Sequence, residues 1–214
     1  MSTGYSPVPA RVAGPADLDA IVATLTTAFF DDPLWGPAFP DADRRAGQAA
    51  AMWRFSVTSS LRYPWTLVTA GAESVAVWIP PGEPELLPGE EAELEALLLE
   101  RTGPGTAAEI MEIFGQLEAA RPSEPHFYLT LLGTHDDHRG QGLGMGLLTE
   151  NLARIDALGA PAYLESSNPA NIRRYERVGF AAHERITIAT GHVVTTMWRP
   201  AHRPQPTDGP GLLD

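Results

Sequence analysis

The chain has 214 residues, 43% of them hydrophobic, and a formal net charge of −12 at pH 7. This length suits one domain with a sizeable core, and no apolar run approaches the length of a membrane span. A surface this acidic repels nucleic acid and anionic membranes and attracts cationic ligands. We therefore expect no nucleic-acid or membrane partner, and an N-terminus without a basic or apolar signal region indicates a cytoplasmic location.

Two residue types are absent, and each absence excludes a mechanism. Without cysteine the protein cannot form an acyl-cysteine intermediate, so group transfer through a thiol is closed. There is no lysine, and all 15 residues counted as Lys or Arg are arginine, which excludes a lysine base and a Schiff base. A group transfer by this chain is therefore expected to be direct.

The N-terminal half predicts a strand, two helices and a hairpin. Asp17 is expected to cap the first helix because an amphipathic run follows it. The segment that begins at Phe30 is rich in proline and glycine and is typical of a loop. In chain order, we expect a strand at residues 10–13, a helix at 17–29, a loop at 30–40, a helix at 41–61 and paired strands at 65–69 and 74–79.

The C-terminal half alternates strands with helices, which is typical of an α/β protein. We expect helices at 90–101 and 106–119, a strand at 127–134, a helix at 143–158, a strand at 162–166, a short helix after 168 and a hairpin of strands at 181–188 and 193–198. Residues 1–7 are expected to be flexible, residues 8–200 to form one domain, and the Pro/Gly-rich residues 201–214 to be a disordered tail.

The most informative motif lies between the strand at 127–134 and the helix after it. It reads Arg-Gly-Gln-Gly-Leu-Gly over Arg139–Gly144. Glycines at such a turn let backbone N–H groups surround an anion, and the helix N-terminus adds positive potential. A dinucleotide fingerprint fails because Met145 and Leu147 stand where a third glycine is needed, and the Gly-Lys-Ser/Thr of triphosphate loops is absent. The turn is expected to bind a pyrophosphate; the alternative is an ordinary tight turn.

A second motif follows at Asn168–Phe180 and ends in Tyr-Glu-x-x-Gly-Phe. Asn168 suits the cap of a helix, and Pro169 suits its first position. Gly179 suits the left-handed residue after a helix end. The segment is therefore expected to be a short capped helix.

The two motifs, in this order and at about this distance, resemble the signature of the GNAT superfamily of N-acetyltransferases, which bind the pyrophosphate of acetyl-CoA. Within it the chain is similar to the puromycin N-acetyltransferases, a branch that confers antibiotic resistance. The similarity runs from about Val8 to Pro200, and Asp32 departs from it, because that branch has tyrosine before the proline. The acceptor pocket is therefore expected to differ. The segments that carry the similarity are Ala76–Trp78, Arg121–Pro122, Tyr128–Gly144, Ala162–Ser167 and Tyr175–Arg177.

The resemblance implies an α/β fold with a mixed, splayed central sheet flanked by helices on both faces. The splay lies between the strands at 127–134 and 163–166, where free backbone groups pair with the pantetheine arm of the co-substrate acetyl-CoA. The residues that the resemblance assigns to acetyl-CoA are Leu132, Gly133, Thr134, Arg139, Gly140, Gln141, Gly142, Leu143, Gly144, Met145, Asn168 and Tyr175.

Acetyl transfer to an amine also needs an acid for the leaving thiolate and a base for the amine. The resemblance places Tyr175 near the sulfur as the acid; the alternative is a ring that packs in the core. The candidates for the base are Asp31, Asp32, Glu83 and Glu165, and Asp32 can instead bind the ammonium group as a counter-ion. An acceptor pocket is expected from Trp35, Phe39, Trp78, Phe127 and Tyr128, with core packing as the alternative for most of them.

The run His135-Asp136-Asp137-His138 lacks a third clear ligand, so no metal is expected. The expected function is an acetyl-CoA-dependent N-acetyltransferase that acts on a small primary amine, antibiotic- or xenobiotic-like, with aromatic or nucleoside character, in a ternary complex. Two alternatives stay open: acetylation of a protein or peptide N-terminus, and a non-catalytic module that binds acyl-CoA. The sequence leaves open whether the protein is a monomer or a homodimer.

Overall fold

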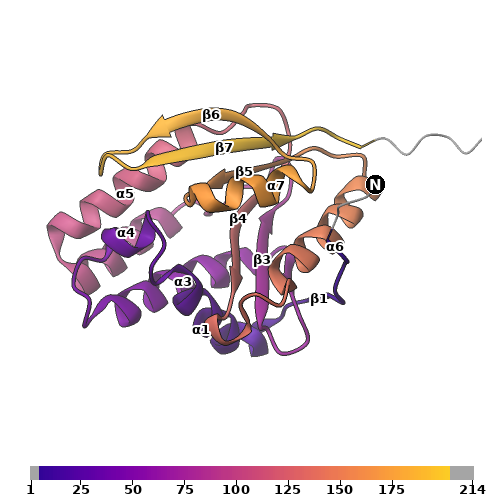
Figure 1. Ribbon diagram of the computed structural model, residues 1–214. Helices are drawn as coiled ribbons and strands as arrows, with labels where there is room; N and C mark the ends of the chain where they lie inside the picture. The colour runs from indigo at the N-terminus through magenta and orange to yellow at the C-terminus, as the bar shows by residue number, and fades with distance from the viewer. Residues whose placement is uncertain (1–4, 203–214) are drawn as a thin grey trace, which may run out of the picture.

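The computed structural model describes residues 5–202, and in this part of the chain seven strands form one mixed sheet with the order β1-β2-β3-β4-β5-β7-β6 (Figure 1). Neighbouring strands there are antiparallel, except that β4 and β5 are parallel. The strands are β1 (Arg11–Val12), β2 (Thr66–Val68), β3 (Ser74–Ile79), β4 (Phe127–Thr134), β5 (Ala162–Ser166), β6 (Ala181–Thr187) and β7 (Val193–Arg199).

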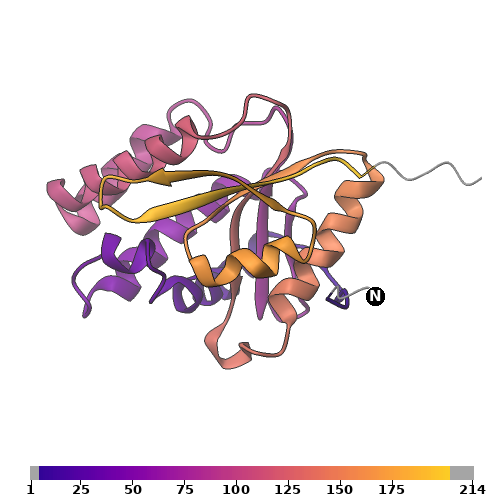
Figure 2. The same cartoon turned by 45° about the horizontal axis from the view of Figure 1, so that its top comes forward.

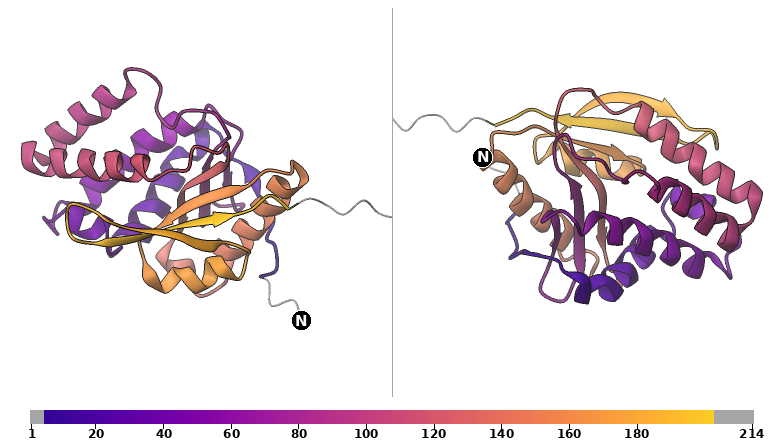
Figure 3. Two further views of the ribbon diagram at one scale, coloured as in Figure 1. Left: turned by 90° about the horizontal axis from the view of Figure 1, so that it is seen from above. Right: turned by 180° about the vertical axis from the view of Figure 1, so that it is seen from behind.

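Helices cover both faces of this sheet, as Figure 3 shows from above and from behind. They are α1 (Leu18–Phe29), α2 (Trp35–Ala38), α3 (Arg45–Ser60), α4 (Glu90–Thr102), α5 (Pro104–Ala119), α6 (Leu143–Ala157) and α7 (Ile172–Glu176).

The two faces follow from the alternation of side chains along the strands. In β3, Val75 and Val77 pack in one buried cluster with residues of α1, α3, α4 and α5. Ala76 and Trp78 pack in a second buried cluster with residues of α6. The structure thus confirms the predicted α/β fold with helices on both faces.

The parallel pair separates soon after it begins. The pairing of β4 with β5 runs from Phe127 opposite Ala162 to Leu129 opposite Leu164. Beyond these residues β4 continues only against β3, and β5 continues only against β7. The expected splay is confirmed, and Figure 2 shows α7 lying in front of it beside the first turns of α6.

A β-bulge marks the point of separation. On the β3 side, Trp78 lies opposite Leu129 and Val77 lies opposite Leu131. Thr130 is therefore the extra residue of β4. Such bulges bend a strand and re-aim its side chains, and they are frequent beside active sites.

The short helix α2 replaces part of the loop expected at residues 30–40. The Asp32 carboxylate accepts the N–H groups of Leu34 at 2.9 Å and of Trp35 at 3.2 Å. This capping satisfies donors that would otherwise lack partners at the start of the helix. A helix of one turn leaves no periodic pattern in the sequence, which is why it was not expected.

Two further details differ from expectation. The Asp17 side chain does not cap α1; it accepts the Gly14 N–H at 2.9 Å and pairs with Arg11 at 2.6 Å. The next helix, α3, begins at Arg45 instead of residue 41, because Asp41 first forms a turn with its carboxylate on the following N–H groups. The bounds of β4 and β5 are those expected.

The two ends of the chain are described only in part. Tyr5, in the segment expected to be flexible, packs against the second cluster. Residues 1–4 and 203–214, which include most of the expected disordered tail, lie outside the described residues. From residue 5 to residue 202, no helix is long and apolar enough to cross a membrane.

Candidate active site

A cavity of ≈ 730 Å³ lies where β4 and β5 part. Its wall combines the two strands with the α1–α2 connection, the glycine loop before α6 and the helix α7. These segments are far apart in sequence and lie side by side around the splay (Figures 1 and 2). A concave site of this size, with polar groups converging on it, is the usual form of a small-molecule site.

The glycine loop, residues 139–144, contributes most of its residues to the cavity wall. Gly142, which precedes α6, has a φ of +78°, in the left-handed region that favours glycine. A Cβ on Gly144 would lie 2.7 Å from the Thr134 Oγ1 atom, so glycine lets α6 approach β4 closely. The first N–H groups of α6 have no partner within the helix and are available to an anion.

Basic side chains accompany this loop. His138, Arg139, Arg174 and Arg177 all line the cavity. The Arg139 guanidinium donates to the last carbonyls of α1, at 2.8 Å and 3.3 Å, and so holds the loop against the negative end of that helix. A glycine turn, a helix N-terminus and several cations together fit the phosphates of coenzyme A.

Most residues that the resemblance assigned to acetyl-CoA lie in the cavity wall. Gln141 does not: it is exposed at the tip of the turn and lines no part of the cavity. Asn168 caps the turn before α7 as expected, because its Oδ1 atom accepts the Ala170 N–H at 3.0 Å. The assigned residues in the wall are Leu132, Gly133, Thr134, Arg139, Gly140, Gly142, Leu143, Gly144, Met145, Asn168 and Tyr175.

Tyr175, on α7, was expected either to donate a proton to the thiolate or to pack in the core, and its position fits both interpretations. Its ring packs against the second cluster, with the Phe180 ring centroid 6.2 Å away. It also lines the cavity. Burial, with a smaller effect from the nearby Asp32 charge, raises the pKa of Tyr175 to about 12. The phenol therefore keeps its proton at neutral pH and is able to donate it.

Asp32 has both carboxylate oxygens engaged. The Oδ1 atom caps α2, and the Oδ2 atom accepts the Ser167 hydroxyl at 2.8 Å. The Ser167 carbonyl in turn accepts from His192 Nε2 at 2.6 Å. Asp32 therefore ties the α1–α2 connection to the segment after β5, which favours a positioning role or a counter-ion over a base. Its neighbour Asp31 is exposed at the cavity rim.

Replacing Asp32 with alanine is expected to lower the free energy of unfolding by about 1–3 kcal/mol, because a helix cap and the bond to Ser167 are both lost. The KM for the amine should rise, since α2 carries Trp35 into the cavity wall. Denaturant titration and steady-state kinetics measure the two effects. The control Asp32→Asn keeps an oxygen for the cap, so the free energy of unfolding should be largely retained. If this variant lost the acidic limb of the pH–rate profile, Asp32 would be the base.

Glu165, on β5, is a buried carboxylate of the cavity wall, with its side chain 6% exposed. Its Oε1 atom has no hydrogen-bond partner among the described residues, and the Arg121 Nε atom lies 4.0 Å away. Burial raises the pKa of Glu165 to about 7, although the Arg121 charge opposes the shift. A carboxylate with a pKa near the working pH is suited to general base catalysis.

Arg121, before β4, lies between two carboxylates. Its guanidinium pairs with Glu85 in the β3–α4 connection and lies over the Tyr128 ring, with Cζ 3.9 Å from the centroid. The sequence-based candidate Glu83 is exposed and lies outside the cavity wall, whereas Glu85 lines it. Glu83 is therefore not supported as the base. No pattern in a Pro/Glu loop distinguishes the two acids, so only the fold could select Glu85.

The prediction that Trp78 binds the acceptor is wrong. Trp78 is fully buried on the α6 face, and its Nε1 atom donates to Asn151 Oδ1 at 2.9 Å. The alternation along β3 turns it away from the cavity. Phe39 and Phe127 are also buried in the core outside the cavity wall.

Trp35 and Tyr128 do line the cavity, together with aromatic residues that sequence reasoning missed. Trp35 packs edge-on against Trp53 at 5.3 Å and lies 5.4 Å from the Phe114 ring. Trp53 and Phe114 belong to long helices, where their spacing indicates only core packing. Their place in the wall depends on how α3 and α5 meet, which no local signal reveals.

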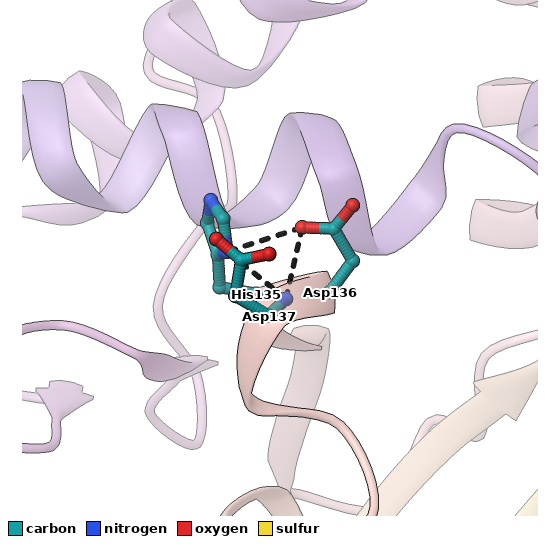
Figure 4. A group of neighbouring side chains, drawn as sticks. All are labelled: His135, Asp136 and Asp137. Atoms are coloured by element: carbon teal, nitrogen blue, oxygen red, sulfur yellow. Dashed lines mark hydrogen bonds and ion pairs between the residues drawn. The ribbon is translucent and has the colours of Figure 1, made fainter.

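His135, Asp136 and Asp137 gather in the turn before the glycine loop (Figure 4). Their potential ligand atoms lie within 4.8 Å of one another. Both aspartates are exposed, and the Asp137 N–H donates to groups of the same turn. Exposed acidic turns of this kind are common without a metal, and we assign no metal to the cluster.

Comparison with known sequences agrees with this geometry. The sequence profile of the acetyltransferase (GNAT) family matches residues 74–180, which contain β3, β4, the glycine loop, β5 and α7. A mycothiol acetyltransferase of Streptomyces avermitilis is 40% identical over 57 residues, 25% of this chain and 18% of that protein. The match therefore spans less than a fifth of that relative's length.

Solved structures match nearly the whole chain. A Corynebacterium glutamicum protein described as histone acetyltransferase HPA2 and related acetyltransferase has a TM-score of 0.68 at 25% identity, covering 94% of this chain and 99% of that one. The arylalkylamine N-acetyltransferase 2 of Aedes aegypti has a TM-score of 0.59 at 12% identity, covering 91% and 99%. The second likeness shows the fold alone.

Proposed function

Because the chain belongs to the acetyltransferase (GNAT) family, we propose that it transfers an acetyl group from acetyl-CoA directly to the primary amine of a small molecule. The acceptor is antibiotic- or xenobiotic-like, with an aromatic or nucleoside part. The observation that carries this proposal is the set of groups that line the cavity. Glycines of the loop and basic residues of the loop and of α7 line it, together with the carboxylates of Glu85 and Glu165 and several aromatic rings. The glycines and cations suit phosphates, and the carboxylates and rings suit a cationic amine with an apolar body.

Two side chains handle the protons in the proposed reaction. Glu165 takes a proton from the amine, whose lone pair then attacks the acetyl carbonyl carbon. As the C–N bond forms and the C–S bond breaks, Tyr175 gives its proton to the thiolate. Tyr175 regains a proton from the nitrogen of the product, so an ammonium substrate releases one proton to solvent overall. The absence of cysteine supports direct transfer without an acyl-enzyme.

Replacing Tyr175 with phenylalanine should lower kcat by roughly 10- to 1,000-fold, because only the donor is removed while the ring still packs. The affinity for acetyl-CoA should change little. Single-turnover kinetics and calorimetry measure the two quantities. The control Tyr63→Phe removes a phenol that donates to the Pro84 carbonyl outside the cavity, so its kcat should stay at the wild-type value. A wild-type kcat in Tyr175→Phe would leave that residue a core residue only.

The proposed function is tested by following free coenzyme A release with a panel of amines. The panel should include puromycin, aromatic monoamines, an aliphatic diamine and a peptide with a free N-terminus. Turnover with the aromatic or nucleoside amines is expected. Turnover confined to the peptide would make the protein an N-terminal acetyltransferase, and acetyl-CoA binding without any turnover would leave a binding module.

A further inference from the structure

The first residues beyond the splay are Thr130 on β4 and Glu165 on β5. Two positions earlier on each strand, Tyr128 and Tyr163 are paired and pack in one small cluster. Because side chains alternate along a strand, Glu165 lies on the same face as Tyr163. No strand pairing joins β4 to β5 at this level within the described residues. The width of the gap is therefore set by other contacts.

A chain of side chains crosses this gap. The Thr130 hydroxyl donates to Glu85 Oε1 at 2.8 Å, and Glu85 pairs with the Arg121 guanidinium. The Arg121 Nε atom lies 4.0 Å from Glu165 Oε1, and neither atom has a hydrogen-bond partner among the described residues. The Tyr128 ring packs against the Arg121 guanidinium. The β3–α4 connection and the segment before β4 thus meet both strands where they part.

We propose that Arg121, held by Glu85, is a positioning residue for acetyl transfer: it keeps the Glu165 carboxylate in place and charged at the fork of the sheet. The inference rests on the proposed function, because it takes Glu165 as the base. Buried ion pairs seldom add net stability, since desolvation offsets the attraction between the charges. Two carboxylates of the cavity wall, Glu85 and Glu165, that gather around the Arg121 guanidinium are therefore not accounted for by stability alone.

The groups around Glu165 shift its pKa in opposite directions. The Arg121 charge lowers the pKa of Glu165, and the Glu85 charge raises it. The Tyr128 and Tyr163 hydroxyls also favour the charged form. On β7, the register partner of Glu165 is the uncharged Thr196. Removing the Arg121 charge should therefore raise the pKa of Glu165, and removing the Glu85 charge should lower it.

The test compares the pH profiles of kcat/KM for the amine in Arg121→Met, Glu85→Gln and Arg62→Met. Arg62 pairs with Glu90 outside the cavity, with exposures of 21% and 24% that match the 20% and 21% of the Arg121–Glu85 pair. The acidic limb should move up by about one pH unit in Arg121→Met and down in Glu85→Gln. It should stay in place in Arg62→Met, and Arg121→Lys should partly restore the wild-type profile.

Opposite shifts of the acidic limb in Arg121→Met and Glu85→Gln would support the positioning role, because a general loss of stability would leave the limb at its wild-type pH. Shifts of one sign in both variants, or no shift in either, would overturn the inference. If the wild type acetylates no amine, the proposed function fails on its own. The inference is then tested by carbon-13 NMR titration of the Glu165 carboxyl in the same variants. Its signal is assigned as the one that disappears in Glu165→Gln. If Arg121→Met does not fold, Glu85→Gln and Arg121→Lys still carry the test.

Discussion

Replacing Glu165 with glutamine is expected to lower kcat by about 10²- to 10⁴-fold, the usual contribution of a general base. Glutamine keeps the size of the side chain but cannot take a proton. In the wild type, kcat/KM should rise through pH 7, because the pKa of Glu165 is raised to about 7. The variant should lack that limb, while its affinity for acetyl-CoA stays unchanged. A variant with wild-type kcat would move the base to Asp31 or Asp32.

The same substitution is expected to stabilise the fold at pH 8. Burial raises the pKa of Glu165 from 4.5 to about 7, so between these values the folded state holds a proton that the unfolded state has released. The favourable contribution of that proton is complete below pH 4.5 and is lost as the pH rises through 7. Above pH 7 the wild type is destabilised by about 3 kcal/mol relative to a neutral side chain.

Denaturant unfolding at pH 4.5 and pH 8 measures this effect. The difference in unfolding free energy between Glu165→Gln and the wild type should grow by about 3 kcal/mol from the lower to the higher pH. A difference that is the same at both values would show that Glu165 does not titrate in this range. A variant that is more stable and less active is the expected trade-off at a buried catalytic charge.

Replacing Gly142 with aspartate is expected to abolish measurable acetyl-CoA binding. The side chain would place a negative charge at the N-terminus of α6, where the pyrophosphate is proposed to lie. The φ of +78° adds strain of about 1–2 kcal/mol for a residue with a Cβ. Titration calorimetry with acetyl-CoA measures the loss, and an unchanged affinity would remove the glycine loop from the binding site.

The control for strain is Gly159→Asp. Gly159 follows the other end of α6, has a φ of +64° and has open space where a Cβ atom would lie. The two variants should lose similar stability, because both force a left-handed conformation on aspartate. Only Gly142→Asp should lose acetyl-CoA. Equal loss of binding in both would mean that strain in α6, and not charge at the glycine loop, disrupts the site.

Local sequence signals were sufficient for much of the fold. The bounds of β4 and β5 were predicted because β-prone apolar runs end at glycine or proline turns, and the glycine loop was found because it requires left-handed residues. The family resemblance supplied the splay, which no propensity indicates. The helix α2 was missed because one side chain, Asp32, creates it.

The acceptor side of the cavity depended on tertiary contacts. Trp78 was assigned to the wrong face because the face of a β3 residue depends on which side of the sheet α6 covers. The pairing of Glu85 with Arg121 joins two connections about 36 residues apart, which no spacing rule predicts. The raised pKa of Glu165 likewise comes from burial, which the sequence does not encode locally.

In the proposed reaction, acetyl-CoA and an amine meet in the cavity between β4 and β5 and react directly. The most direct test is the initial rate of coenzyme A release over a matrix of acetyl-CoA and amine concentrations. Double-reciprocal plots should intersect, because both substrates must be bound before transfer. Parallel plots, or an acetylated enzyme formed with acetyl-CoA alone, would contradict the claim.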